Sequence, residues 1–146
     1  MGFLFADGAI TQYNHSYDIE LSLKIDDKEH VEKFAKALNK EYVNNNSTYR
    51  SRCTLGSKHM FNVLSSYGCT VRKSLILKFP DKNIFKDKNL IRHFIRGYVD
   101  GDGCLSFANK EHTRSVVSIL GTENFLRGIT KEVPNKTKLV NNSKDQ

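Results

Sequence analysis

Hydrophobic and polar residues alternate through much of the first half of the chain, a pattern typical of strands with one buried face. The clearest run, residues 19–25, places Ile or Leu at every odd position. We expect this strand to pair with residues 9–13 through a turn at residues 14–16. A second strand pair is expected between residues 41–43 and 48–55.

Apolar residues recur at helical spacing elsewhere in the chain. The strongest series occupies positions 90–98, just before Gly103, and Asp87 or Asn89 can cap the helix that it predicts. Further helices are expected around residues 31–38, 58–66 and 125–129. The first of these follows the candidate caps Asp26 and Asp27, and the last follows the candidate cap Thr122.

The hairpin pattern returns in the second half of the chain. Leu105 and Phe107 alternate with small and polar residues, and Ser115, Val117 and Ile119 would form the inward face of the partner strand. We therefore expect a second half-buried strand pair.

The chain contains an internal repeat. Residues 2–10 read GFLFADGAI and residues 97–105 read GYVDGDGCL, so that Gly2, Asp7 and Gly8 match identical residues 95 positions later. Each copy is followed by a hairpin and a helix, which predicts an α+β fold with the order α-β-β-α-β-β-α, complete in the first copy. We assign residues 1–80 to the first unit, 81–89 to a linker and 90–146 to the second. We expect the second copy to be incomplete and the first helix to be shortened.

Composition narrows the class of protein. The chain has 146 residues, 38% of them hydrophobic, which is enough for a packed core, and its formal charge of +7 favours a polyanionic partner. Three scattered cysteines do not make a disulfide framework and indicate an intracellular protein, cytoplasmic or nucleoid-associated. No apolar run is long enough for a membrane span, so we expect no membrane partner. The abundance of lysine and asparagine weakly indicates an AT-rich genome such as that of a phage.

Asp7 and Asp102 are the candidate catalytic residues. Each follows a helix whose C-terminal end is already negative, so neither aspartate stabilises its helix. Helices packed through their glycines would bring the two carboxylates together, and a divalent cation such as Mg²⁺ would relieve their repulsion. On a basic protein this arrangement favours metal-assisted phosphodiester hydrolysis. The alternative is a simple Asp-Gly helix stop, which the duplication makes less favourable.

Residues 91–103, IRHFIRGYVDGDG, resemble the signature of the LAGLIDADG homing endonucleases, and residues 2–10 resemble a shortened copy of it. This resemblance implies a pseudo-dimer in which the two signature helices cross at the centre and antiparallel sheets form a DNA-binding saddle. It also implies a site-specific endonuclease acting on double-stranded DNA.

The resemblance further implies a set of site residues. Asp7 and Asp102 would bind Mg²⁺ or another divalent cation between the scissile phosphates, assisted by the carbonyls of Ala6 and Gly101. A basic residue would support each phosphate, for which Lys73 is the first candidate. Arg72 is the second candidate for this basic residue. Asp100 matches a further acidic position of the signature in the second copy, where the first copy has Phe5 instead. The alternative for both basic residues is solvated charge on a loop.

The polar faces of the expected strands are the candidate DNA-binding surface, because a two-stranded ribbon fits the major groove. The alternative is an ordinary solvent face. In the first unit the candidates are Thr11, Tyr13, His15, Ser22, Lys24, Arg50 and Arg52, with Glu20 fitting either interpretation. In the second unit they are Ser106, Lys110, Arg114 and Ser118, interleaved with Ala108 and Val116.

Two classes of function stay open at this stage. One is a metal-dependent homing endonuclease, as a fragment or a degenerate copy. The other is a catalytically inactive nucleic-acid-binding protein on the same scaffold, either a transcription regulator or an intron maturase. Because the second unit is expected to be incomplete, we expect self-association through it, and nicking of one strand at best. We also expect Phe125, Leu126 and Ile129 to be less covered than Val31, Phe34 and Leu38.

Overall fold

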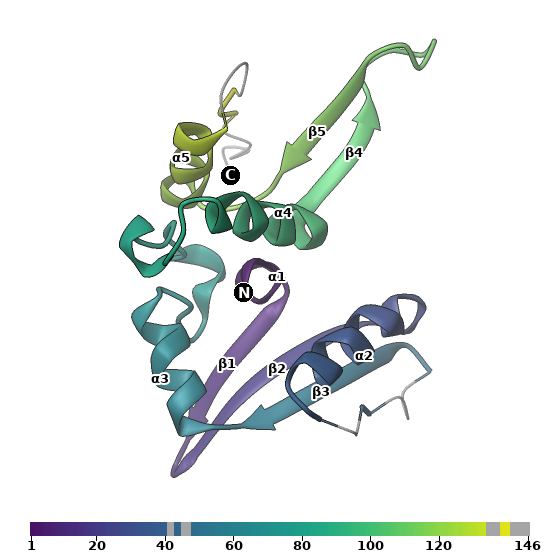
Figure 1. The fold of residues 1–146 in the computed structure, drawn as a ribbon. Coiled ribbons are helices and arrows are strands. Elements are labelled where there is room, and N and C mark those ends of the chain that lie inside the picture. The colour runs from purple at the N-terminus through teal and green to yellow at the C-terminus, as the bar shows by residue number, and fades with distance from the viewer. Residues whose placement is uncertain (41–42, 45–47, 134–137, 141–146) are drawn as a thin grey trace, which may run out of the picture.

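The computed structural model describes residues 1–40, 43–44, 48–133 and 138–140. Its fold is α+β, with a three-stranded antiparallel sheet in the order β1-β2-β3 and a two-stranded antiparallel ribbon, β4-β5 (Figure 1). The helices α1 and α4 lie between these sheets (Figure 1). In the described part of the chain, no helix is both long enough and apolar enough to cross a membrane.

The three-stranded sheet is formed by β1 (Gly8–Tyr13), β2 (Ser16–Lys24) and β3 (Arg50–Gly56). The predicted hairpin is confirmed, and its turn includes Asn14 at φ 52°, a left-handed conformation that asparagine tolerates. The strand expected at residues 41–43 falls partly on residues 41–42, which lie outside the described residues. Next to them, Asn44 forms a single antiparallel bridge to Arg52 at the free side of β3.

Helices α2 (Lys28–Ala37) and α3 (Lys58–Ser66) lie against the three-stranded sheet. Val31 and Ala35 of α2 share a buried cluster with Leu21 and Cys53 of the strands. Asp27 stands at the N-cap of α2 but its side chain makes no capping hydrogen bond, because a short 3₁₀ turn, η1 (Ile25–Asp27), precedes the helix. The odd-numbered side chains of β2 face the core, as the alternation predicts.

The segment between α3 and α4 contains two further 3₁₀ turns, η2 (Lys73–Leu75) and η3 (Lys82–Ile84). Helix α1 (Gly2–Ala6) packs against α4 (Leu90–Asp102) at the centre of the molecule. An aromatic cluster fills the space beneath them, where the Phe94 ring meets Phe5 edge-on with centroids 5.1 Å apart and meets Phe79 at 5.6 Å. The larger of the two buried apolar clusters thus contains residues of both crossing helices.

Helix α5 (Glu123–Glu132) begins where Thr122 accepts a hydrogen bond from the Phe125 amide, as its sequence predicts. The expectation that this helix would be poorly covered is wrong. Phe125 and Ile129 are as buried as Val31 of α2. The reason is that α5 packs on the central aromatic cluster, with Phe125 against Tyr98 at 4.1 Å.

The ribbon is formed by β4 (Gly103–Phe107) and β5 (Ser115–Ile119), with Leu105 opposite Val117. The expected strand pair is present, but the expected burial of its apolar face is not found. Leu105 is 72% exposed, Val117 59% and Phe107 52%. The ribbon projects away from the helices (Figure 1). Its apolar side chains are correspondingly exposed in the described part of the structure.

Candidate active site

Three glycines allow the backbones of α1 and α4 to cross at close range. A Cβ on Gly2 would overlap the Phe94 carbonyl, and a Cβ on Gly97 would lie 3.1 Å from the Phe3 nitrogen. A Cβ on Gly101 would lie 2.5 Å from both the Ala6 Cβ and the Asp7 Oδ2. The close approach that the repeated glycines predict is therefore present.

The crossing brings two carboxylates together at the ends of the two helices. Asp7 is the C-cap of α1, and Asp102 is the last residue of α4. Burial, followed by the negative charge of Asp102, raises the pKa of Asp7 above its ordinary value, and Lys73 opposes this shift. Asp7 therefore carries an electrostatic cost that a bound cation would relieve.

Lys73 of η2 also lies at the helix crossing, next to Asp7. Its ammonium donates a hydrogen bond to the Ala6 carbonyl at 2.7 Å, and the residue is only 9% exposed. Burial lowers the pKa of Lys73, while Cys69, Asp102 and Asp7 act in the opposite direction. Solvated loop charge is therefore the wrong interpretation for Lys73, although it fits the exposed Arg72 next to it.

The metal ligands that the sequence leads us to expect at the crossing are all oxygen atoms. They are the carboxylates of Asp7 and Asp102 and the carbonyls of Ala6 and Gly101. The Ala6 carbonyl already accepts from Lys73 and keeps a second lone pair. Among the described residues, no group of three or more His, Cys, Asp or Glu side chains could hold a metal. The donor set fits a hard cation such as Mg²⁺, which binds through a few carboxylates and otherwise keeps water.

Tyr98 is a site residue that the sequence analysis did not single out. Its buried hydroxyl donates to the Leu120 carbonyl at 3.0 Å, and burial together with Asp102 raises its pKa. The available signal was its position four residues before Asp102, which puts both side chains on one face of α4.

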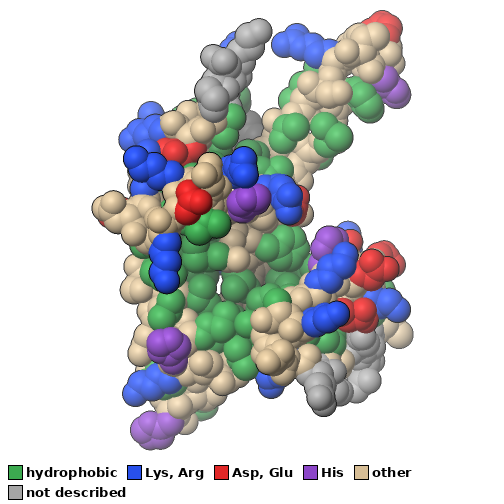
Figure 2. All heavy atoms as spheres, viewed as in Figure 1, with side chains coloured by type: hydrophobic (Ala, Val, Ile, Leu, Met, Phe, Trp, Pro, Cys, Tyr) green, Lys and Arg blue, Asp and Glu red, His purple; other side chains and the backbone are tan. Residues whose placement is uncertain are grey.

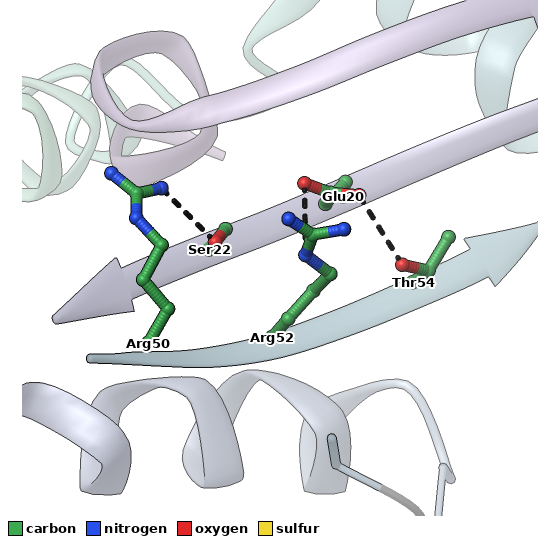
Figure 3. A network of polar contacts seen from close by, with 5 residues as sticks. All are labelled: Glu20, Ser22, Arg50, Arg52 and Thr54. Atoms are coloured by element: carbon green, nitrogen blue, oxygen red, sulfur yellow. Dashed lines mark hydrogen bonds and ion pairs between the residues drawn. The ribbon is translucent and has the colours of Figure 1, made fainter. Parts of the chain in front are cut away.

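The polar face of the three-stranded sheet holds an ordered set of side chains (Figure 3). Arg52 forms an ion pair with Glu20 at 3.4 Å, and Arg50 donates to the Ser22 hydroxyl at 3.2 Å. Among the first-unit candidates, His15 lies in the turn between β1 and β2. The strand pairing places the others on this face: Thr11, Tyr13, Ser22, Lys24, Arg50 and Arg52.

The candidates of the second unit are spread over the ribbon. Ser106 and Ser118 lie on the face opposite Leu105 and Val117. Lys110 and Arg114 lie beyond the paired strands, in the connection at the tip. Figure 2 shows charged and histidine side chains at this tip and hydrophobic side chains along the ribbon.

No known family model and no curated protein sequence matches this chain. Similar solved structures include the LAGLIDADG homing endonuclease I-GzeII in complex with its DNA target, at 16% identity and a TM-score of 0.44. The LAGLIDADG meganuclease I-CpaMI bound to uncleaved DNA is similar at 12% identity and a TM-score of 0.45. Both matches cover 80% of this chain, and the chain spans 62% of each of those structures. The family named in these matches is the one that the two sequence motifs resemble.

Proposed function

We propose that this chain acts as a metal-dependent DNA endonuclease of the LAGLIDADG homing type, built from the two repeated units. The observation that carries the proposal is the pair of carboxylates at the glycine-packed helix crossing, with a buried lysine beside them. Neither aspartate serves helix stability, and Asp7 is electrostatically strained by its neighbour. A site of this kind favours an incoming cation over an empty state.

Each residue at the crossing has a distinct part in the proposed reaction. Asp7 and Asp102 would hold the divalent cation, together with the carbonyls of Ala6 and Gly101. The cation supplies Lewis-acid activation of the phosphodiester and of water. Lys73 orients the Ala6 carbonyl and places a positive charge where a scissile phosphate would approach.

The proposed partner is double-stranded DNA inside the cell. The overall charge of +7 attracts the phosphate backbone, and the polar sheet face presents Arg50 and Arg52. Glu20 contacts Arg52 and Ser22 contacts Arg50, so both arginines lie along this exposed sheet face, where they can meet DNA (Figure 3). A role in intron homing would follow from a long, specific target.

A cleavage assay on a randomised DNA library tests the proposal, because such a library presents many candidate target sequences at once. We expect Mg²⁺-dependent cleavage by the chain, and loss of cleavage with retained DNA binding in Asp102→Asn. Lys73→Met should slow cleavage by more than about tenfold. Glu123→Gln is the matched control, because Glu123 pairs with Arg127 on the surface of α5.

Binding to selected DNA without cleavage at any Mg²⁺ concentration would contradict the endonuclease and leave a binding protein on the same scaffold. Nicking of a single strand would agree with the presence of one described lysine at the crossing, Lys73.

A further inference from the structure

The connection between β4 and β5, residues 108–114, forms the tip of the ribbon (Figure 1). The strand pairing extends into it, because the Ala108 amide donates to the Arg114 carbonyl at 2.9 Å. In a regular antiparallel ladder the Arg114 amide would return this bond to Ala108. It donates to the Asn109 side chain instead, at 3.1 Å, so the ladder ends where Asn109 begins to organise the loop.

The Asn109 carboxamide uses its full hydrogen-bonding capacity within this loop. Its Oδ1 accepts from the Thr113 amide at 3.2 Å and from the Arg114 amide at 3.1 Å. Its Nδ2 donates to the Thr113 hydroxyl at 2.6 Å and to the Glu111 carboxylate at 2.9 Å. An asparagine side chain has two acceptor lone pairs and two donor hydrogens, so none is left over. One side chain thus ties both ends of the loop together.

Backbone and ring contacts give the loop further order. The His112 amide donates to the Asn109 carbonyl at 3.2 Å, and His112 has a left-handed backbone at φ 56°. The His112 ring stacks on Phe107, with centroids 4.6 Å apart and planes 20° from parallel. Because Phe107 is the last residue of β4, this stack joins the loop to the paired strands. The exposed tip therefore has a defined shape.

The tip carries two cations, Lys110 and Arg114, and one carboxylate, Glu111. In the part of the chain that the structure describes, neither Lys110 nor Arg114 forms an ion pair. The carboxylate of Glu111, which follows Lys110 directly, accepts from Asn109 instead. Both cations are exposed. The loop therefore presents two cations on an ordered backbone, where a polyanion can reach them.

We propose that Asn109 is a positioning residue that holds the ribbon tip in the shape in which Lys110 and Arg114 contact DNA phosphates. This inference rests on the proposed function, and it adds the ribbon tip to the sheet face as a DNA contact. Phosphate contacts fix how a protein sits on the duplex without reading its sequence. A loop that is ordered before DNA arrives loses less conformational entropy on binding than a flexible loop does.

The variant Asn109→Ala removes the four side-chain hydrogen bonds and leaves both cations in place. Its affinity for a duplex selected by binding from a randomised DNA library should fall about tenfold. The affinity for unselected duplex of the same length should fall to the same extent, because phosphates are common to both. Asn62→Ala is the matched control, because Asn62 is exposed on α3, and it should keep the affinity of the unaltered chain.

A second variant exchanges the donor and the acceptor of one hydrogen bond. Asn109→Asp combined with Glu111→Gln keeps the net charge of the tip. The new carboxylate can still accept from the Thr113 and Arg114 amides, and the new amide can donate to it. This pair of substitutions should restore the affinity that Asn109→Ala loses. An affinity as weak as that of Asn109→Ala would overturn the proposal.

The cations provide a test that a purely structural role of Asn109 would not pass. In a background of Lys110→Ala and Arg114→Ala, Asn109→Ala should have no further effect on DNA affinity, because positioning acts only through those side chains. An equal loss of affinity in both backgrounds would overturn the proposal.

These titrations are made without divalent metal, which separates the inference from the proposed function. If the unaltered chain binds neither duplex, the proposed function fails and the inference fails with it. If the unaltered chain binds DNA and Asn109→Ala binds equally well, only the inference is overturned. If the affinities change as expected in a chain that never cleaves DNA, the endonuclease fails and the inference holds.

Discussion

Residues without side chains decide how close the two carboxylates of this protein come. Gly101 is the clearest case, because any Cβ there would collide with Ala6 and with the Asp7 carboxylate. Alanine is otherwise favoured over glycine inside a helix by roughly 0.5–1 kcal/mol. The glycine is therefore explained by contact with the neighbouring helix and not by the helix that contains it.

Gly101→Ala should destabilise the protein by about 1–3 kcal/mol, the usual cost of overpacking a close contact. Chemical denaturation measures the change. Gly56→Ala is the matched control, because a Cβ there meets only the Asp18 carboxylate, at 3.5 Å. Equal effects of the two substitutions would show that the helices do not cross at Gly101.

Asp7→Asn should stabilise the metal-free protein at neutral pH. The folded state raises the pKa of Asp7, so it binds the proton more tightly than the unfolded chain does. Ionisation therefore costs stability as the pH rises through the folded pKa, and the cost vanishes below the ordinary aspartate range. The melting temperature of Asp7→Asn should exceed that of the unaltered chain at neutral pH, and the two should converge near about pH 3.5. A difference in melting temperature that stays constant over this pH range would contradict the raised pKa of Asp7.

At the scale of elements, local patterns in the sequence predict the features that depend only on residues close together in the chain. The first hairpin, the pairing of β4 with β5 and the Thr122 cap each follow from spacing within a few residues. The burial of Phe125 did not follow, because it depends on Phe79 and Tyr98, which come from other parts of the chain. The exposure of the ribbon was missed for the same reason: alternation shows which face is apolar but not what covers it.

The residues of the candidate site also fall into those that the sequence reveals and those that only the fold reveals. Asp7 and Asp102 were visible as a repeat, whereas the hydroxyl of Tyr98 has no counterpart in the other copy. The burial of Lys73 depends on how η2 folds back onto α1, over a separation of 67 residues from Ala6. The roles of Asp7, Asp102 and Lys73 stay predictions that the experiments above address.

The arginines of β3 should matter for DNA and little for folding. Exposed ion pairs contribute about 0–1 kcal/mol, so Arg50→Ala and Arg52→Ala should each change stability by less than about 1 kcal/mol. Each should weaken DNA binding and reduce the slope of log affinity against log salt by about 1. Arg127→Ala on α5 is the control, because it also removes an exposed ion pair. Salt-independent binding would argue against a nucleic-acid partner.

At the scale of the whole molecule, the sheet and the ribbon extend from the helix crossing in different directions (Figure 1). The sheet is backed by α2 and α3, whereas the ribbon presents Leu105, Phe107 and Val117 to solvent in the described part of the chain. A two-stranded ribbon is marginal on its own, and an exposed apolar face favours association.

We therefore expect the protein to self-associate as its concentration rises. The double substitution Leu105→Ser and Val117→Thr should increase the monomer fraction in sedimentation experiments. Ser106→Thr and Ser118→Thr, on the opposite face of the ribbon, should not. Association that survives the first pair of substitutions would place the contact elsewhere.

The central claim is that Asp7 and Asp102 hold one divalent cation between the two helices. Calorimetric titration with Mn²⁺ tests it most directly, because it needs neither the DNA target nor turnover. The account predicts binding by the unaltered chain that is lost in both Asp7→Asn and Asp102→Asn and retained in Glu123→Gln. Identical Mn²⁺ isotherms for all four proteins would contradict it.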